Sequence, residues 1–392
     1  MPIETVSTPW NGSTNPYLEG IEVVREGDKS GYGMVVRFTL RGNREVSVIA
    51  LPHQFPTRTG PTWAYLVDCE GWTLVDAGPS GALSALEQGL KVLGRKLTDL
   101  KRVIITHGHE DHDGNAYDLV KASGAELWAH EIYGSMLRAD RWEMEMGWRR
   151  KVHGFGAFET SQTVTSAREH HDLNRQLTLD HPVTDLHQSG GLTFYHTPGH
   201  SPDELCILFD QVLFSGDHIL PLITPHPSVA MSYTSFQSTL PAAYREGNEI
   251  YGLKAFLTSL KRVAAMEGDI TVLPAHRAFH RGRFNPVGVE RATEIVEHHR
   301  NRCHELTDVM KAGPMDLVTL TKRYFSDRKL EEQNFFPAFS EVMSHIELMQ
   351  ETGDVSTMVD PVNSTVWSNG LGPGALVRWE GSELFSAFID RL

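Results

Sequence analysis

Short runs of hydrophobic and β-branched residues, each followed by turn residues, recur along the larger, N-terminal part of the chain. This pattern predicts strands at 34–40, 46–51, 63–68, 72–75, 102–105, 126–129, 192–195, 205–209, 212–214 and 270–273. Between them, leucines at helical spacing predict a helix that begins with Ser80 as its N-cap and ends near Gly94. Further patterns predict helices at 115–123 and 252–266. The alternation of strands and helices predicts an α/β architecture.

One segment interrupts this alternation. Residues from about 131 to 180 place tryptophan and methionine among charged residues and then become polar, which predicts a helical insertion. Two interpretations of the insertion stay open. It is either a lid over a functional site or a surface excursion that only packs on the domain.

From about residue 285 the hydrophobic pattern is helical, and it predicts helices at 287–310, 315–324 and 338–351. A segment rich in glycine, proline and asparagine follows, with short β-prone pieces. Three helices followed by a β-like hairpin predict a small winged-helix-like domain. We therefore expect an α/β domain over 1–284 and a C-terminal winged-helix-like domain over 285–392.

The composition is that of a globular protein, because 40% of the 392 residues are hydrophobic and 22% are charged. The net charge of −14 disfavours tight binding of a nucleic-acid backbone. No run of 18 apolar residues occurs, and the N-terminus has no basic region followed by an apolar one. We expect a cytoplasmic protein that acts on a small-molecule substrate, without a membrane partner. A homodimer is an open alternative to a monomer.

Histidine is abundant and cysteine is scarce, with 20 histidines against 3 cysteines. Three widely separated cysteines exclude a disulfide framework, a cysteine-rich zinc finger and an iron–sulfur cluster. Any metal site in this chain must therefore be built from imidazole and carboxylate groups.

Potential metal ligands follow the ends of several predicted strands, where α/β proteins commonly place their sites. Four of them occur within six residues after the strand at 102–105: His107, His109, Asp111 and His112. Three more follow later strands: His200, Asp217 and His276. Five histidines and two aspartates suit two divalent ions, zinc first, with iron or manganese also acceptable. Asp217 is the candidate for a carboxylate shared between the two ions.

The motif His107-x-His-x-Asp-His112, together with the later donors and an upstream Asp76, resembles the metallo-β-lactamase superfamily over about residues 46–280. The resemblance implies a four-layered αβ/βα sandwich with two metal ions at one edge. It implies a first ion on His107, His109 and His200, a second on Asp111, His112 and His276, and Asp217 as the bridge. Asp76 would orient the ligands. The segment 216–225 and the C-terminal helices resemble the lactamase-beta-2-like and glyoxalase-II-like branches.

These features predict a metal-dependent hydrolase that cleaves an acyl bond (thioester, ester, lactone or amide) with a hydroxide bridging two metal ions. Asp111 could accept or relay the proton of this nucleophile. The alternative is a metal-dependent phosphodiesterase or ribonuclease. A regulatory DNA-binding protein is a third hypothesis, but the predicted last helices carry glutamates that disfavour it. Four other histidines, His53, His130, His226 and His280, could line a pocket, but we expect each of them at the surface. We expect His298, His299 and His304, which lie on a charged predicted helix, to face solvent.

Overall fold

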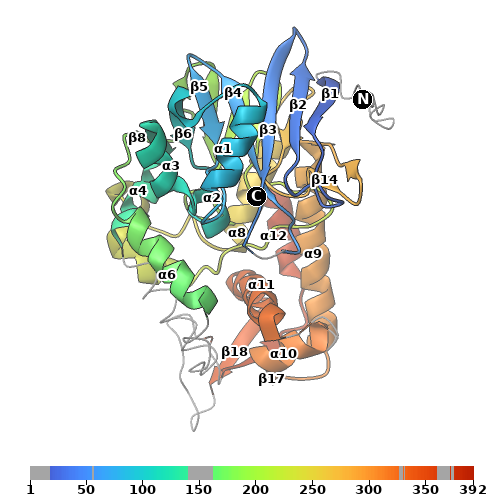
Figure 1. Ribbon diagram of the computed structural model, residues 1–392. Coiled ribbons are helices and arrows are strands. Elements are labelled where there is room, and N and C mark those ends of the chain that lie inside the picture. Colours follow the sequence, from blue (N-terminus) through green and yellow to red (C-terminus); the bar gives the residue numbers. More distant parts are fainter. Residues whose placement is uncertain are drawn as a thin grey trace.

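Two β-sheets form the centre of the molecule in a computed structural model that describes residues 18–54, 57–139, 162–325, 330, 332–359, 371 and 375–392 (Figure 1). The first sheet has eight strands in chain order, antiparallel up to β5 and parallel from β5 to β8. Its strands are β1 (Leu18–Arg25), β2 (Val35–Leu40), β3 (Arg44–Leu51), β4 (Thr62–Asp68), β5 (Trp72–Val75), β6 (Leu100–Ile104), β7 (Glu126–His130) and β8 (His181–Val183).

The second sheet has the strand order β16-β13-β12-β11-β10-β9, in which only the β12–β13 pair is parallel. Its strands are β9 (Gln188–Ser189), β10 (Leu192–His196), β11 (Leu205–Phe209), β12 (Val212–Phe214), β13 (Thr271–Leu273) and β16 (Val287–Gly288). A separate hairpin of β14 (Phe279–His280) and β15 (Arg283–Phe284) lies between β13 and β16 in the chain.

Alternation along the strands builds four layers. In β3, Val46 and Val48 face the second sheet, whereas Ile49 and Leu51 face a cluster that includes residues of α1 (Leu83–Val92) and α3 (Ala116–Ser123). In the second sheet, Ile207 faces the first sheet and Cys206 faces the side of α8 (Leu253–Ala264) and α9 (Glu290–Met310). Because successive side chains of a strand point to opposite faces, the sheets pack on each other and carry helices outside. The predicted αβ/βα sandwich is confirmed.

The chain after α9 adds helices and a small sheet at one end of the molecule (Figure 1). The sheet has the order β17-β19-β18. Its elements, in chain order with the helices, are β17 (Met315–Asp316), α10 (Leu317–Tyr324), α11 (Glu332–Glu351), β18 (Val355–Val359), β19 (Ala375–Trp379) and α12 (Leu384–Arg391). A helical C-terminal region is confirmed. One hydrophobic cluster runs from Leu213 and Phe256 to Val342 and Phe385, so the region packs firmly on the sandwich, and the boundary at 284/285 stays a prediction.

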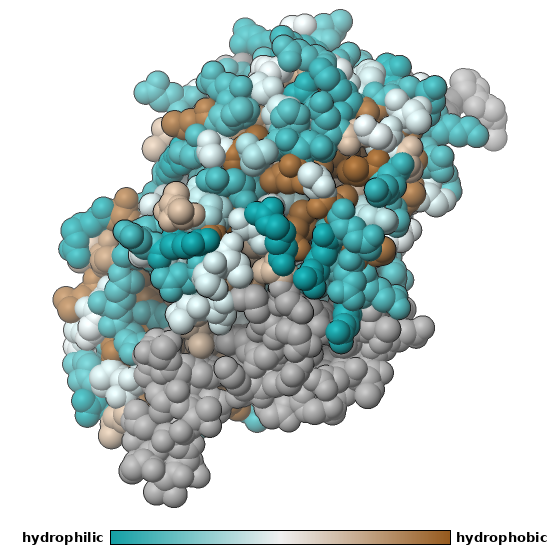
Figure 2. All heavy atoms as spheres, turned by 90° about the vertical axis from the view of Figure 1, so that its left-hand side faces the viewer, coloured by the Kyte–Doolittle hydropathy of each residue, from teal (hydrophilic) through white to brown (hydrophobic). Residues whose placement is uncertain are grey.

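Two sequence predictions need correction or limitation. Ser80 is not an N-cap, because α1 has Ala82 at that position and the Ser80 hydroxyl instead donates to the Gly114 carbonyl at 3.2 Å. The predicted insertion contains α4 (Glu131–Arg138) and α6 (Gln162–Asn174), while residues 140–161 lie outside the described part of the chain. Figure 2 shows the left-hand side of Figure 1, where hydrophilic residues cover most of the coloured surface and hydrophobic residues gather in a band across its upper part. Among the described residues, no helix is both long and apolar enough to cross a membrane.

Candidate metal centre

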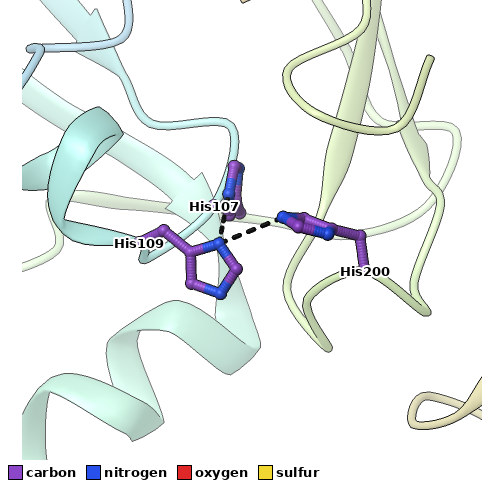
Figure 3. Close-up of side chains that lie close together, drawn as sticks. All are labelled: His107, His109 and His200. Atoms are coloured by element: carbon purple, nitrogen blue, oxygen red, sulfur yellow. Dashed lines mark hydrogen bonds between the residues drawn. The ribbon is translucent and has the colours of Figure 1, made fainter. Parts of the chain in front are cut away.

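Three histidines from two separate loops converge at the edge of the sandwich (Figure 3). His107 and His109 lie between β6 and the short helix α2 (Glu110–Asp113), and His200 lies in the loop between β10 and β11. His107 Nε2 is 2.9 Å and His200 Nε2 is 3.1 Å from His109 Nδ1. The nitrogen atoms of all three rings are close enough to surround one cation.

A second group of donors lies beside the first. His276 follows β13, and its Nε2 is 3.1 Å from Asp111 Oδ2. His112 Nε2 is 3.8 Å from Asp111 Oδ1. His53, which is half-buried, joins Asp111 and His276 in a cluster that could hold a metal ion. The loop between β3 and β4 thus contributes a potential ligand that we had expected to be a surface residue.

Asp217 lies between the two groups. Its Oδ1 is 3.6 Å from His112 Nε2 and 3.5 Å from His276 Nε2, whereas its Oδ2 is 3.8 Å from His200 Nε2. The two oxygens of one carboxylate therefore face different donor groups. The structure brings together all seven residues that the sequence selected as metal ligands: His107, His109, Asp111, His112, His200, Asp217 and His276.

Each of three imidazoles has its outer nitrogen fixed by a separate acceptor. His112 Nδ1–H donates to Asp76 Oδ2 at 2.9 Å, and Asp76 is in turn held by the amide and hydroxyl groups of Thr106. His200 Nδ1–H donates to the carbonyl of His226 at 2.8 Å, and His276 Nδ1–H to that of Pro61 at 3.1 Å. A neutral imidazole that carries its proton on Nδ1 has a lone pair on Nε2. In that neutral state the Nε2 lone pair of each ring points into the centre, as in protein metal sites.

A sequence profile of the metallo-beta-lactamase superfamily matches residues 57–276, which is more than half of the chain and contains all seven donors and Asp76. The chain belongs to the metallo-beta-lactamase superfamily. The probable metallo-hydrolase YqjP of Bacillus subtilis is 23% identical to it over 316 residues, which are 77% of this chain and 92% of the relative. This membership confirms the predicted superfamily and its class of enzyme, the metal-dependent hydrolases.

Two solved structures share the fold of this superfamily member. A metallo-beta-lactamase family protein from Thermus thermophilus aligns with a TM-score of 0.62 at 22% identity, over 86% of this chain and 98% of that protein. A beta-lactamase domain protein from Burkholderia ambifaria aligns with a TM-score of 0.61 at 22% identity, over 85% of this chain and 91% of that protein. Both alignments cover more of the chain than the superfamily profile does. The finer branch, the winged-helix assignment and the roles of individual residues stay predictions.

Sequence reasoning missed two carboxylates that support the superfamily motif. Glu204 is fully buried; its Oε2 is 3.2 Å from His107 Nδ1, and its Oε1 accepts the Asp217 amide proton at 3.1 Å. Asp203 Oδ2 accepts the amide proton of Gly108 at 2.9 Å. The signal that could have found them is a pair of acidic residues placed between the His200 turn and a hydrophobic strand, where buried carboxylates need partners.

Burial and the close contacts of the centre set its protonation. Burial alone would lower the pKa of His112, but Asp76, Asp111 and Asp217 outweigh it and hold this pKa well above its ordinary value. For His107, burial and then the neighbouring histidines hold the pKa well below its ordinary value. Burial disfavours ionised Asp111 and Asp217, yet the histidines keep the pKa of both carboxyl groups below the ordinary value. Both aspartates are therefore ionised at neutral pH, and a cation that binds His112 Nε2 must displace a proton.

The donor geometry fits bound cations. In a tetrahedral site with zinc–nitrogen bonds of about 2.0–2.1 Å, neighbouring ligand atoms lie about 3.3 Å apart. The donor atoms lie 2.9 to 3.8 Å apart. His112 Nε2 and Asp217 Oδ1 are buried and have no hydrogen-bond partner among the described residues. Buried polar atoms without partners are costly, and a cation between these two would satisfy both.

Two histidines that we expected at the surface are buried in the core. His130 is 0% exposed at the end of β7, where its Nδ1 accepts the amide proton of Ile132 and caps α4. His299 is also 0% exposed, and its Nδ1 lies 3.0 Å from Nε2 of His345 on α11. The expectation was wrong in both cases because these imidazoles find hydrogen-bond partners inside the protein, which removes most of the cost of burying them.

Proposed function

We propose that the chain is a dinuclear metal-dependent hydrolase that cleaves an acyl bond (a thioester, ester, lactone or amide). The observation that carries this proposal is the position of Asp217, whose two oxygens face two separate groups of donors. A single metal site would need only one of these groups. A carboxylate between two ions about 3.5–4 Å apart is the arrangement of two-metal hydrolytic sites.

His107, His109 and His200 would hold one ion, and Asp111, His112 and His276 the other. Nitrogen and oxygen donors of this kind suit zinc, and they also accept iron or manganese. Two bound cations would supply hydroxide at neutral pH and stabilise the negative charge that develops on the carbonyl oxygen. No serine or cysteine nucleophile is then required.

The side chains of this centre would divide the remaining tasks. Asp111 is the most exposed of the donor carboxylates, with 27% of its side chain exposed against 12% for Asp217. It is therefore the carboxylate that a substrate or a water molecule reaches first, and it would accept or relay the nucleophile's proton. Asp76 would keep His112 in the tautomer that presents Nε2, which makes Asp76 a positioning residue.

The C-terminal region would shape the substrate site rather than bind nucleic acid. The carboxylate of Glu347 on α11 accepts the amide protons of Ala230 and Met231 at 2.7 and 3.0 Å. These residues follow the loop that contains Asp217 and His226. The acidic balance of the chain, 50 acidic against 36 basic residues, favours an acyl substrate over a phosphodiester, which is the alternative.

Metal analysis combined with a substrate panel tests the proposal. The panel consists of p-nitrophenyl esters, acyl-coenzyme A thioesters, lactones, a chromogenic cephalosporin and bis-p-nitrophenyl phosphate. We expect about two metal ions per chain and turnover of at least one acyl substrate. Turnover of the phosphodiester alone would establish the alternative.

The matched variants are Asp217→Asn and Asp210→Asn. Both replace an aspartate by its isostere, but Asp210 lies in the turn between β11 and β12, at the opposite end of β12 from Asp217, and pairs with Arg44 at the surface. Asp217→Asn should lower metal content and abolish turnover, and Asp210→Asn should change neither. Full activity of Asp217→Asn would refute a shared carboxylate.

A further inference from the structure

A basic hairpin follows the last candidate ligand directly. After His276 the chain forms β14 and β15, in which Phe279 is paired with Phe284 and His280 with Arg283. The two phenylalanine rings contact each other at 4.9 Å between centroids and pack against the core between the two sheets. Because side chains alternate along a strand, His280 and Arg283 lie on the opposite, outer face of the hairpin.

Three arginines lie on or next to the outer face of the hairpin, at positions 277, 281 and 283. Arg277 Nη1 donates to His280 Nε2 at 2.6 Å, and burial together with Arg277, Arg281 and Arg283 lowers the pKa of His280. We call Arg277, His280, Arg281 and Arg283 the arginine face. Among the described residues, none of its three arginines forms an ion pair with a carboxylate, although acidic residues outnumber basic ones in the chain as a whole. Like charges gathered without a counter-ion form a site that attracts anions.

The backbone at two of these arginines is unusual. Arg277 has a φ of 63° and Arg281 a φ of 54°, in the left-handed region that glycine and asparagine adopt most easily. A long side chain at such a position is uncommon, and residues in sparsely populated backbone regions cluster at functional sites. At both positions, 277 and 281, the chain has an arginine although glycine or asparagine would adopt the left-handed backbone more easily.

The arginine face is tied to the metal centre. Arg277 is the residue after His276, and its Nη2 donates to the carbonyl of Arg58. His276 Nδ1–H donates to the carbonyl of Pro61 in the same loop. The hairpin and the loop before β4 therefore hold each other in place beside the second group of donors. Arg277 is half-buried, whereas Arg281 and Arg283 are exposed.

We propose that the arginine face binds an anionic oxygen group of the substrate, a carboxylate or a phosphoryl group, while the bond to be cleaved lies at the metal centre. The inference rests on the proposed hydrolase function and narrows its substrate class to anionic acyl compounds. Guanidinium groups suit this task because their planar N–H donors match the oxygens of carboxylate and phosphoryl groups. Arg277 and Arg281 are specificity-determining residues in this proposal, with no part in breaking the bond.

The variants that test it are Arg277→Asn and Arg281→Asn. Asparagine removes the charge and tolerates the left-handed backbone at both positions, so the hairpin should remain folded. Lys91→Gln is the control, because it removes one positive charge from an exposed position on α1, on the outer side of the first sheet. Circular dichroism and metal content verify that each variant is intact.

Turnover is compared within two pairs of substrates that differ in charge. Butyryl-coenzyme A against S-butyryl-pantetheine probes a phosphoryl group, and mono-p-nitrophenyl succinate against p-nitrophenyl butyrate probes a carboxylate. In wild type the anionic member of at least one pair should have the higher kcat/KM. Each asparagine variant should reduce that preference by about 10- to 100-fold, the effect of one or two charge-assisted hydrogen bonds. The pair that responds identifies the anionic group.

Binding of ethers and thioethers, which have no acyl bond, separates this inference from the hydrolase proposal. Calorimetry compares S-butyl-coenzyme A with S-butyl-pantetheine, and 4-butoxybutanoate with 4-butoxybutan-1-ol. Tighter binding of an anionic probe that the asparagine variants lose, without turnover of any substrate, would support the arginine face and refute the acyl hydrolase. The arginine face is refuted if wild type shows no preference for either anionic probe, or if Lys91→Gln loses the preference equally.

Discussion

Replacing Asp76 with asparagine is expected to weaken metal binding in one half of the centre and to leave the other half intact. Asp76 Oδ2 accepts the Nδ1 proton of His112, while the amide and hydroxyl of Thr106 donate to the same carboxylate. Asparagine has the same size but only one acceptor oxygen. If that oxygen stays with Thr106, the new NH₂ group faces the Nδ1–H of His112, and two donors meet. His112 then loses its partner or moves its proton to Nε2, the atom that would bind metal.

The size of the effect follows from the loss of one such partner. Removing a carboxylate that orients a ligating histidine typically lowers metal affinity by about 10- to 100-fold, or about 1.4–2.7 kcal/mol. The loss should be confined to the ion held by Asp111, His112 and His276. The outer nitrogens of His107 and His200 face Glu204 and the His226 carbonyl instead, and neither of these groups changes.

Competition titration with a chelating dye measures this effect, because it resolves a separate dissociation constant for each ion. One constant should rise in Asp76→Asn and the other should stay within about twofold of wild type, with Asp210→Asn matching wild type in both. Circular dichroism shows whether the variant is folded. Equal weakening of both sites would mean that Asp76 supports the whole edge of the sandwich, and unchanged constants would mean that it does not fix the His112 tautomer.

Two further predictions concern the C-terminal region. Acidification should destabilise the fold. Burial above all holds the pKa values of His299 and His345 well below their ordinary value. Below about pH 6.5 the unfolded chain therefore binds more protons than the folded chain, and the free energy of unfolding falls. Each of these histidines contributes about 1.4 kcal/mol to the decrease in the free energy of unfolding between pH 7.5 and pH 5.5. Urea unfolding of His299→Gln at the two pH values should show a decrease that is smaller by this amount. A decrease as large as that of wild type would contradict a buried neutral pair. Glu347→Gln should lower the free energy of unfolding by about 1–2 kcal/mol and raise KM without changing metal content, and an unchanged KM would argue against a C-terminal region that shapes the site.

The sequence predicted the sheets and the donor set because both depend on local signals. The strands at 205–209 and 212–214 were predicted with the bounds that the structure has, since a buried strand in a sandwich is a short apolar run between turns. The donors could be assigned because each follows such a strand. Asp76 could be assigned only by resemblance, since nothing near it in the sequence shows that its partner is His112, 36 residues away.

Properties that depend on packing between distant segments were missed. His299 was expected in solvent because charged residues surround it in the sequence, yet it lies on the same helical stripe as Ile295, Cys303 and Leu306, all of them buried. That spacing was the available signal, and the polarity of histidine obscured it. The partner that makes burial tolerable, His345, lies on another helix, so single-sequence periodicity could not supply it.

The acceptors that hold the ligating histidines come from parts of the chain that are far apart. Pro61 precedes β4, Asp76 follows β5 and His226 precedes α7. Because each acceptor belongs to a different loop, the orientation of the imidazoles is a property of the complete sandwich and not of the short histidine motif. A peptide that carried the motif alone would hold its rings in many orientations and would pay to order them on binding a metal. In the folded chain this conformational entropy is already lost when the sandwich forms. The donor atoms can therefore converge to within 4 Å with their metal-binding nitrogens directed toward one another.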